Sequence, residues 1–173
     1  MIPGSDGSFR IIFELEIDED GWPPVGTERI WATLVDEVTA DDKYNTNAMT
    51  KKAIYRVDNI PFFIPLLAYK DLIEAEEKEG SLFFVKLVKR SQHSTVRIIF
   101  LETTIIEDVL SKLRALGCEL EMAEMYKHLT TVDIPIDVSF LAVRTYLAEL
   151  ENNGLIDFQE SLISEHHNKE IVN

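Results

Sequence analysis

Cysteine, basic charge and long apolar runs are all scarce in this chain of 173 residues. Cys118 is the only cysteine, so no disulfide can form within the chain, as is usual in a reducing compartment. The longest uncharged apolar run, residues 60–69, contains two prolines and is far shorter than the ~20 residues of a membrane-spanning helix. The amino terminus lacks the basic and then apolar pattern of a secretory signal. We therefore expect a cytoplasmic protein without a membrane segment.

The shortage of basic residues limits the partners that the chain can bind. Its 31 Asp and Glu outnumber its 17 Lys and Arg, and the formal net charge is −14. Affinity for a phosphate backbone comes largely from Lys and Arg that displace counterions, so we do not expect a nucleic-acid ligand. A basic protein partner is favoured, because opposite charges accelerate encounter. The alternative is that the acidity serves solubility alone.

Motifs of metal and cofactor sites are also missing. The chain contains no Cys-x-x-Cys, no His-Glu-x-x-His and no glycine-rich phosphate loop. The adjacent pair His166 and His167 provides too few ligands for a specific zinc site. We predict neither a metal nor a cofactor.

The acidic stretch at residues 16–28, EIDEDGWPPVGTE, begins like a calcium-binding EF-hand loop. Glu16, Asp18 and Asp20 have the spacing of the first three ligands, and Gly21 has the position of the bend. However, Thr27 occupies the twelfth position, which requires a bidentate glutamate, and strand-like segments flank the loop in place of helices. The stretch is therefore interpreted as an acidic, solvent-facing turn.

What the chain does contain is a series of short segments rich in β-branched and aromatic residues. Turn residues such as Asp20-Gly21 and Asp58-Asn59 separate the first of them. The polar stretch at residues 36–52 has no periodicity and is interpreted as a loop or hairpin tip. The predicted strands are residues 9–17, 29–35, 53–57, 71–77 and 81–90. Residues 1–91 are thus predicted to form a small, mostly antiparallel β-barrel.

The rest of the chain alternates strands with helices. Thr104 and Glu107 have capping-box spacing at the start of one helix, and Gly117 ends it. Asp137 is the expected cap of a second helix, which stops at Asn153-Gly154. The predicted strands are residues 95–102, 119–126, 129–135 and 155–163. This order is that of a ferredoxin-like split βαβ fold over residues 92–163, and residues 164–173 are expected to be a flexible tail. The predicted fold class is α+β.

Four strings in this order resemble a bacterial family known as domain of unknown function 4265. They are DEDGWPPV, ERIWA, YRVDNIPFF and STVRIIF, and the resemblance runs from about residue 9 to residue 163. The chain has Lys70 before Asp71, where the family tends to have glycine, and its link over residues 36–52 is longer than is usual there. The resemblance supports the fold and implies no activity.

The leading functional hypothesis is non-catalytic binding of a basic protein, in its most specific form as an immunity-type inhibitor. The predicted contact residues are acidic side chains and one tryptophan in two loops: Asp18, Glu19, Asp20, Trp22, Asp41 and Asp42. An exposed Trp on an acidic loop is typical of a binding hot spot, although Trp22 could instead pack over the barrel mouth.

The alternative is an enzyme or a small-molecule sensor with a site around His93, at the junction of the two halves. His93 would be a general base, oriented by Asp71 or Asp58, with Ser91 nearby. The competing interpretation is a hydrogen-bonded turn. Cys118 follows the helix-ending Gly117 and is expected to be a buried apolar residue rather than a nucleophile.

Overall fold

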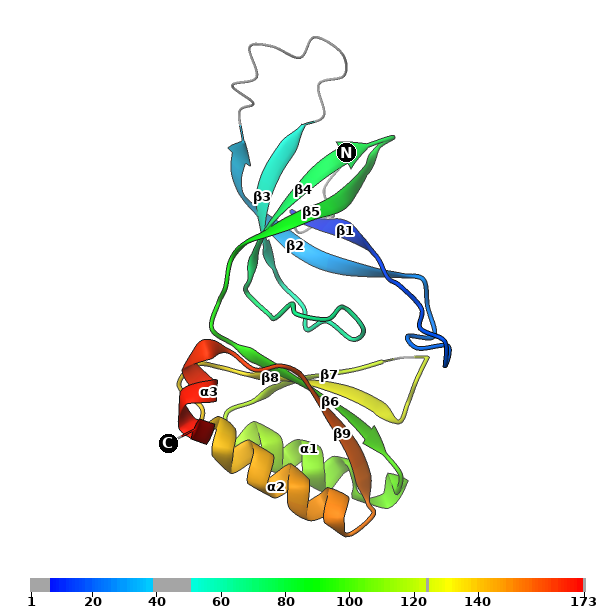
Figure 1. Cartoon of the computed structure of the whole chain (residues 1–173), viewed down its shortest axis with the longest axis vertical. Helices are drawn as coiled ribbons and strands as arrows, with labels where there is room; N and C mark the ends of the chain where they lie inside the picture. The colour runs from blue at the N-terminus through cyan, green and yellow to red at the C-terminus, as the bar shows by residue number, and fades with distance from the viewer. Residues whose placement is uncertain (1–6, 39–50, 124, 173) are drawn as a thin grey trace. The chain divides into compact units, whose positions relative to one another are not determined.

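The computed structural model describes residues 7–38, 51–123 and 125–172, and the chain divides into two compact units (Figure 1). The first unit consists of Met1–Asn59 and Lys70–Ser91, and the second of Ile60–Tyr69 and Gln92–Asn173. The predicted α+β class is confirmed, with a barrel in the first unit and an antiparallel sheet with helices in the second. The segment Ile60–Tyr69, which the sequence placed within the barrel region, groups with the second unit.

The first unit is a closed five-stranded barrel. Consecutive strands pair antiparallel, and β1 pairs with β5 in parallel. The parallel pair follows from the strand number, because five strands that reverse direction at each step leave the first and the last running the same way. The strands are β1 (Ser8–Glu14), β2 (Thr27–Val38), β3 (Lys52–Val57), β4 (Leu72–Lys78) and β5 (Ser81–Lys89).

Alternate residues of the barrel strands form its core, as the twofold period of a strand requires. Ile11, Ile30, Val57 and Ile73 are fully buried, each from a different strand. Lys70, two residues before β4, has an unusual backbone conformation, with a φ of 64°. Glycine adopts this left-handed conformation more readily than lysine does, so Lys70 is a position where glycine would fit with less strain.

The second unit contains a four-stranded antiparallel sheet in the order β7-β8-β6-β9. Helices α1 (Ile106–Ala115) and α2 (Phe140–Asn152) lie on one face of it (Figure 1). This connectivity and strand order are those of the predicted ferredoxin-like fold. The strands are β6 (Ser94–Phe100), β7 (Glu119–Met122), β8 (Leu129–Ile134) and β9 (Ile156–Leu162). None of the helices in the described ranges is long and apolar enough to cross a membrane.

The two faces of this sheet differ in chemistry. Val96, Ile98 and Phe100 alternate along β6 and pack with α1 and α2 in the core. Thr95 and Arg97, on either side of Val96, therefore point to the opposite face, and both are buried.

Part of the segment Ile60–Tyr69 covers this opposite face. Arg97 donates from Nη2 to the carbonyl oxygen of Ile64 at 3.2 Å. The N–H of Ile60 donates to Oε1 of Glu121 at 3.0 Å, and the ring of Phe63 meets that of Tyr126 edge to face. The segment is thus held to β6, to β7 and to the turn after β7.

The predicted starts of both helices were wrong, whereas their ends are confirmed. A 3₁₀ turn, η1 (Thr103–Ile105), precedes α1, so Ile105 becomes the N-cap and no side chain caps the helix. The cap of α2 is Ser139 in place of Asp137, and its Oγ accepts from the N–H of Ala142. Gly117 and Gly154 follow the two helices with φ values of 99° and 69°, as glycines that end helices do.

The expected flexible tail is a helix, α3 (Glu165–Val172). His167 is fully buried, and its ring stacks on that of Phe140 with centroids 5.6 Å apart. Its Nδ1 lies 2.7 Å from Oγ of Ser94, and that oxygen accepts from the N–H of Ser164. The prediction failed because it treated a polar segment as unable to pack, although a histidine whose ring nitrogen has a partner can be buried.

Burial of His167 predicts that the second unit loses stability in acid. Removal from water lowers the pKa of His167, and the neighbouring Glu170 opposes this effect only in part. The unfolded chain therefore takes up a proton first as the pH falls below about 6.5, the ordinary value for histidine. We expect the free energy of unfolding to decrease from about pH 7 to about pH 5, measured by urea unfolding.

The matched control for this pH dependence is His167→Gln, which keeps a polar side chain but does not titrate in this range. Its unfolding free energy should fall less between the two pH values than that of the wild type. An equal fall in the two proteins would assign the acid sensitivity to other groups.

Candidate functional site

The predicted acidic loop between β1 and β2 is ordered by its own hydrogen bonds. Oδ1 of Asp18 accepts from the N–H groups of Asp20 at 3.0 Å and Trp22 at 2.8 Å. The N–H of Asp18 in turn donates to the carbonyl oxygen of Trp22 at 2.7 Å, and Gly21 has a φ of 82°. Asp18 is therefore the residue that shapes the loop, and its carboxylate is used within it.

The other predicted contact residues of this loop are exposed in whole or in part. Glu19 and Asp20 are exposed, and Trp22 is 37 % exposed. The remaining two predicted residues, Asp41 and Asp42, lie outside the described residues. The loop thus presents two carboxylates and part of an indole ring on a fixed turn. Within the described ranges, no group of three or more His, Cys, Asp or Glu is arranged to hold a metal ion.

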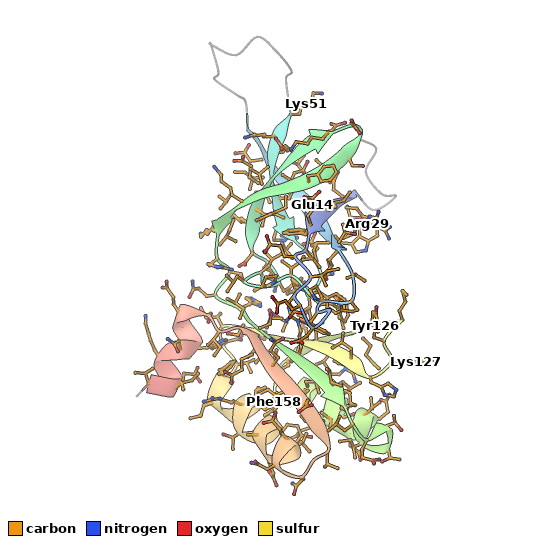
Figure 2. The ribbon with its side chains drawn as sticks, turned by 45° about the vertical axis from the view of Figure 1, so that its right-hand side comes forward. Glu14, Arg29, Lys51, Tyr126, Lys127 and Phe158 are labelled. Atoms are coloured by element: carbon orange, nitrogen blue, oxygen red, sulfur yellow. The ribbon has the colours of Figure 1, made fainter. Side chains whose placement is uncertain are left out.

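A second acidic feature of the barrel was not singled out from the sequence. An open hollow of about 810 Å³ lies along the seam between β1 and β5. Three glutamates line it, Glu14 from β1 (labelled in Figure 2), Glu77 from β4 and Glu79 from the following turn. Its apolar lining comes from Ile12, Phe83 and Phe84. Lys78 and Ser81 complete the lining, and we call this hollow the seam pocket.

His93 is buried in the second unit and pairs with a carboxylate that the sequence did not suggest. Its Nδ1 lies 2.8 Å and 3.0 Å from the two carboxylate oxygens of Asp133. Asp133 is fully buried, and the ring of Tyr69 meets that of His93 edge to face. A histidine oriented by a carboxylate has the geometry of a general base and its orienting group, and it is also a common structural pair.

The other residues of the alternative site belong to the first unit. Asp71 is fully buried and accepts from Nη1 of Arg90 at 3.1 Å and from the N–H of Ser91 at 2.7 Å. These bonds join the start of β4 to the end of β5. Asp58 accepts from the hydroxyl of Thr33 and from Nε of Arg56. The structure therefore brings Asp71 and Ser91 together, and it brings His93 to Asp133.

Cys118 has the environment of a structural residue. It is buried in the helix-covered core of the second unit. Burial, with a smaller contribution from Asp133, raises the pKa of its thiol to about 12. A thiol with so high a pKa holds almost no thiolate near neutral pH, so Cys118 is not an activated nucleophile.

Comparison with known proteins places the chain in a family. The sequence profile of Domain of unknown function (DUF4265) matches residues 45–158, which is more than half of the chain. The chain belongs to the DUF4265 family. Of the strings that carried the resemblance, those around Asn59-Ile60 and at β6 lie within the match, and those around Trp22 and Trp31 precede it.

Comparison with a solved structure of the same fold does not indicate an activity. The chain is similar to a hypothetical protein from Neisseria gonorrhoeae, with a TM-score of 0.67 and 17 % identity, over 91 % of this chain and 95 % of that one. At this identity the likeness concerns the fold alone. None of the curated proteins compared matches the chain.

In this DUF4265 protein, two features escaped prediction for different reasons. The seam pocket joins residues far apart in the sequence, and only closure of the barrel brings them together. Asp133 did carry a signal, because it is an acidic residue inside the otherwise uncharged strand LTTVDI. A charged residue within a buried strand needs a partner, which makes it a candidate for a specific pair.

Proposed function

We propose that this protein is a cytoplasmic, non-catalytic binding protein that recognises a basic protein partner. The observation that carries the proposal is the loop between β1 and β2, which Asp18 orders while Glu19 and Asp20 stay exposed. A loop already held in one conformation loses little entropy on binding. Its carboxylates attract a basic surface, and Trp22 provides apolar area at the centre of the contact.

The most specific form of the proposal is an immunity-type inhibitor. Such a protein covers the basic active site of a toxin with an acidic surface of its own. The net charge of −14 supports this form, because long-range attraction between opposite charges accelerates the capture of a basic target. It also predicts a contact that weakens as salt rises.

The test is a pull-down from nuclease-treated lysate of the source organism, eluted with a salt gradient and identified by mass spectrometry. The variant is Glu19→Lys with Asp20→Lys, which leaves the carboxylate of Asp18 to shape the loop. We expect one basic protein to elute from the wild type, and to bind the variant about tenfold or more weakly, because two attractive charges become repulsive.

The matched control carries the same change of charge in the other unit, as Glu149→Lys with Glu151→Lys near the end of α2. Both residues are exposed, and positive charge at that end of a helix is tolerated. The control should bind the partner nearly as the wild type does. Equal elution of the loop variant and the wild type would argue against this loop as the contact.

A second candidate function is an enzyme or small-molecule sensor that uses His93. The observation that favours it is the distance of 2.8 Å between Nδ1 of His93 and Oδ2 of Asp133, in a buried setting. Its test is a thermal-shift screen of metabolites on the wild type and on Asp133→Asn. A ligand that raises the melting temperature of the wild type alone would support this candidate, and a screen without any such ligand would count against it.

A further inference from the structure

The seam of the barrel is its most weakly paired junction. Seven residue pairs join β1 to β2, whereas only Ile11 with Leu82 and Ile12 with Phe83 join β1 to β5. Beyond these two pairs the strands are not joined to each other within the described residues, and the seam pocket lies along this junction. The pocket is therefore a consequence of how the barrel closes.

The floor of the seam pocket is aromatic and held in place. The ring of Phe84 stacks on that of Phe13 with centroids 4.4 Å apart and an interplanar angle of 21°. Phe84 nevertheless remains 36 % exposed, and Phe83 is half-buried beside it. Aromatic faces carry partial negative charge and attract cations, so an exposed ring on this acidic barrel is suited to a cationic group.

The glutamates that line the seam pocket also favour a cationic group. Glu14 and Glu79 are exposed, and Glu77 is half-buried. Among the described residues that line the hollow, Lys78 is the only cation, and its ammonium pairs with Glu76. An anionic ligand would be repelled by Glu14 and Glu79, and a neutral apolar ligand would form no charge interaction with them. The barrel surface already holds one contact of the required kind, since the guanidinium of Arg10 lies 4.3 Å from the centre of the Trp31 ring.

We propose that the seam pocket binds an arginine side chain presented by the basic partner, a proposal that rests on the proposed function. A guanidinium group can stack on a phenylalanine ring while its edge donates hydrogen bonds to carboxylates, which a lysine ammonium does less well. The pocket is open rather than enclosed, which suits one side chain of a larger partner better than a small molecule buried on most sides.

The experiment titrates the isotope-labelled full chain with N-acetyl-arginine amide and follows its backbone amide signals by NMR. The uncharged isostere N-acetyl-citrulline amide is the control ligand. We expect saturable shifts confined to Ile12 through Glu14 and Glu77 through Phe84, with a dissociation constant in the millimolar range, about what one side chain in an open site provides. The citrulline compound should produce no saturable shift.

Single substitutions then test separately how the glutamates and the aromatic residues of the seam pocket contribute to arginine binding. Glu14→Gln and Glu79→Gln should each weaken binding roughly two- to fivefold, the range for an exposed charge pair. Phe83→Leu keeps an apolar floor but removes one aromatic face, and it should also weaken binding. The matched control Glu149→Gln, exposed in the second unit, should have no effect.

Two results would overturn the proposal. One is an equal response to arginine and citrulline amides, and the other is a set of shifts spread over exposed carboxylates elsewhere in the chain. Failure of this proposal can be told apart from failure of the proposed function, because the NMR titration needs no partner protein. Saturable arginine binding without any protein in the pull-down would keep the pocket and reject the basic protein partner, whereas partner binding without an arginine response would do the reverse.

Discussion

Replacing His93 with alanine should lower the free energy of unfolding of the second unit by about 3–5 kcal/mol. The imidazole makes contacts of 2.8 Å and 3.0 Å with the carboxylate of Asp133, which is fully buried. Removal of one member of a buried pair leaves the other in a medium that solvates charge poorly, and this is why the effect is large. Urea unfolding followed by far-UV circular dichroism measures it, because all described α-helices lie in the second unit.

The chain provides its own internal comparison for this measurement. Both tryptophans, Trp22 and Trp31, lie in the first unit, so their fluorescence reports on the barrel. The control His128→Ala removes an exposed histidine and should change stability by less than about 0.5 kcal/mol. The double variant His93→Ala with Asp133→Ala should lose less than the sum of the two single losses, because the two residues share one interaction.

If His93→Ala instead unfolds at the same urea concentration as the wild type, the buried pair does not stabilise the fold. A pair that is buried and hydrogen-bonded without stabilising the protein would then need a functional reason, and the second candidate function would gain weight. A large loss of stability would make the pair a structural element of the polar sheet face.

The strands and helices could be predicted from the sequence because their apolar residues recur with a regular period. Alternation of buried residues along β1 and β2, and helical spacing in α1 and α2, are local properties that survive in a single sequence. The ferredoxin-like order then followed from the succession of elements. Helix starts were less accessible, because a 3₁₀ turn before α1 moves the cap by one residue and replaces a side-chain cap with backbone bonds.

The elements that escaped prediction are those whose place depends on tertiary packing. Helix α3 has a polar composition, yet His167 and Ile171, four residues apart, pack inward, as does Ile163, which precedes the helix by two residues. Counting histidine among the inward-facing residues would have revealed this face. The segment Ile60–Tyr69 has no periodicity, and its place is set by bonds to Arg97 and Glu121, which no local pattern encodes.

The candidate sites also differ in whether their residues are neighbours in the sequence or are brought together by folding. The acidic loop could be read directly, because Asp18, Glu19, Asp20 and Trp22 are near neighbours in sequence. What the sequence could not show is that Asp18 shapes the loop while Glu19 and Asp20 remain exposed. The seam pocket requires the parallel β1–β5 junction, which exists only once the barrel has closed.

Replacing Phe140 with alanine should lower the free energy of unfolding of the second unit by about 3–5 kcal/mol. Phe140 is the first residue of α2, is fully buried in the helix-covered core and stacks on His167 of α3. The substitution removes apolar contact and leaves a cavity that a close-packed interior cannot fill. Circular dichroism during urea unfolding should show the loss, with Leu141→Ala as the control at an adjacent residue that is 48 % exposed.

The same substitution tests whether α3 depends on the core beneath it. Besides the stack on Phe140, α3 is held by Glu170, whose Oε2 accepts from the hydroxyl of Ser139 at 3.1 Å. Loss of the Phe140 ring should therefore speed amide hydrogen exchange in Glu165–Val172 more than in α1, because local opening follows the loss of local packing. Equal acceleration in the two helices would mean that the second unit opens as a whole, and that α3 is as firmly integrated in it as the helices of the ferredoxin-like core.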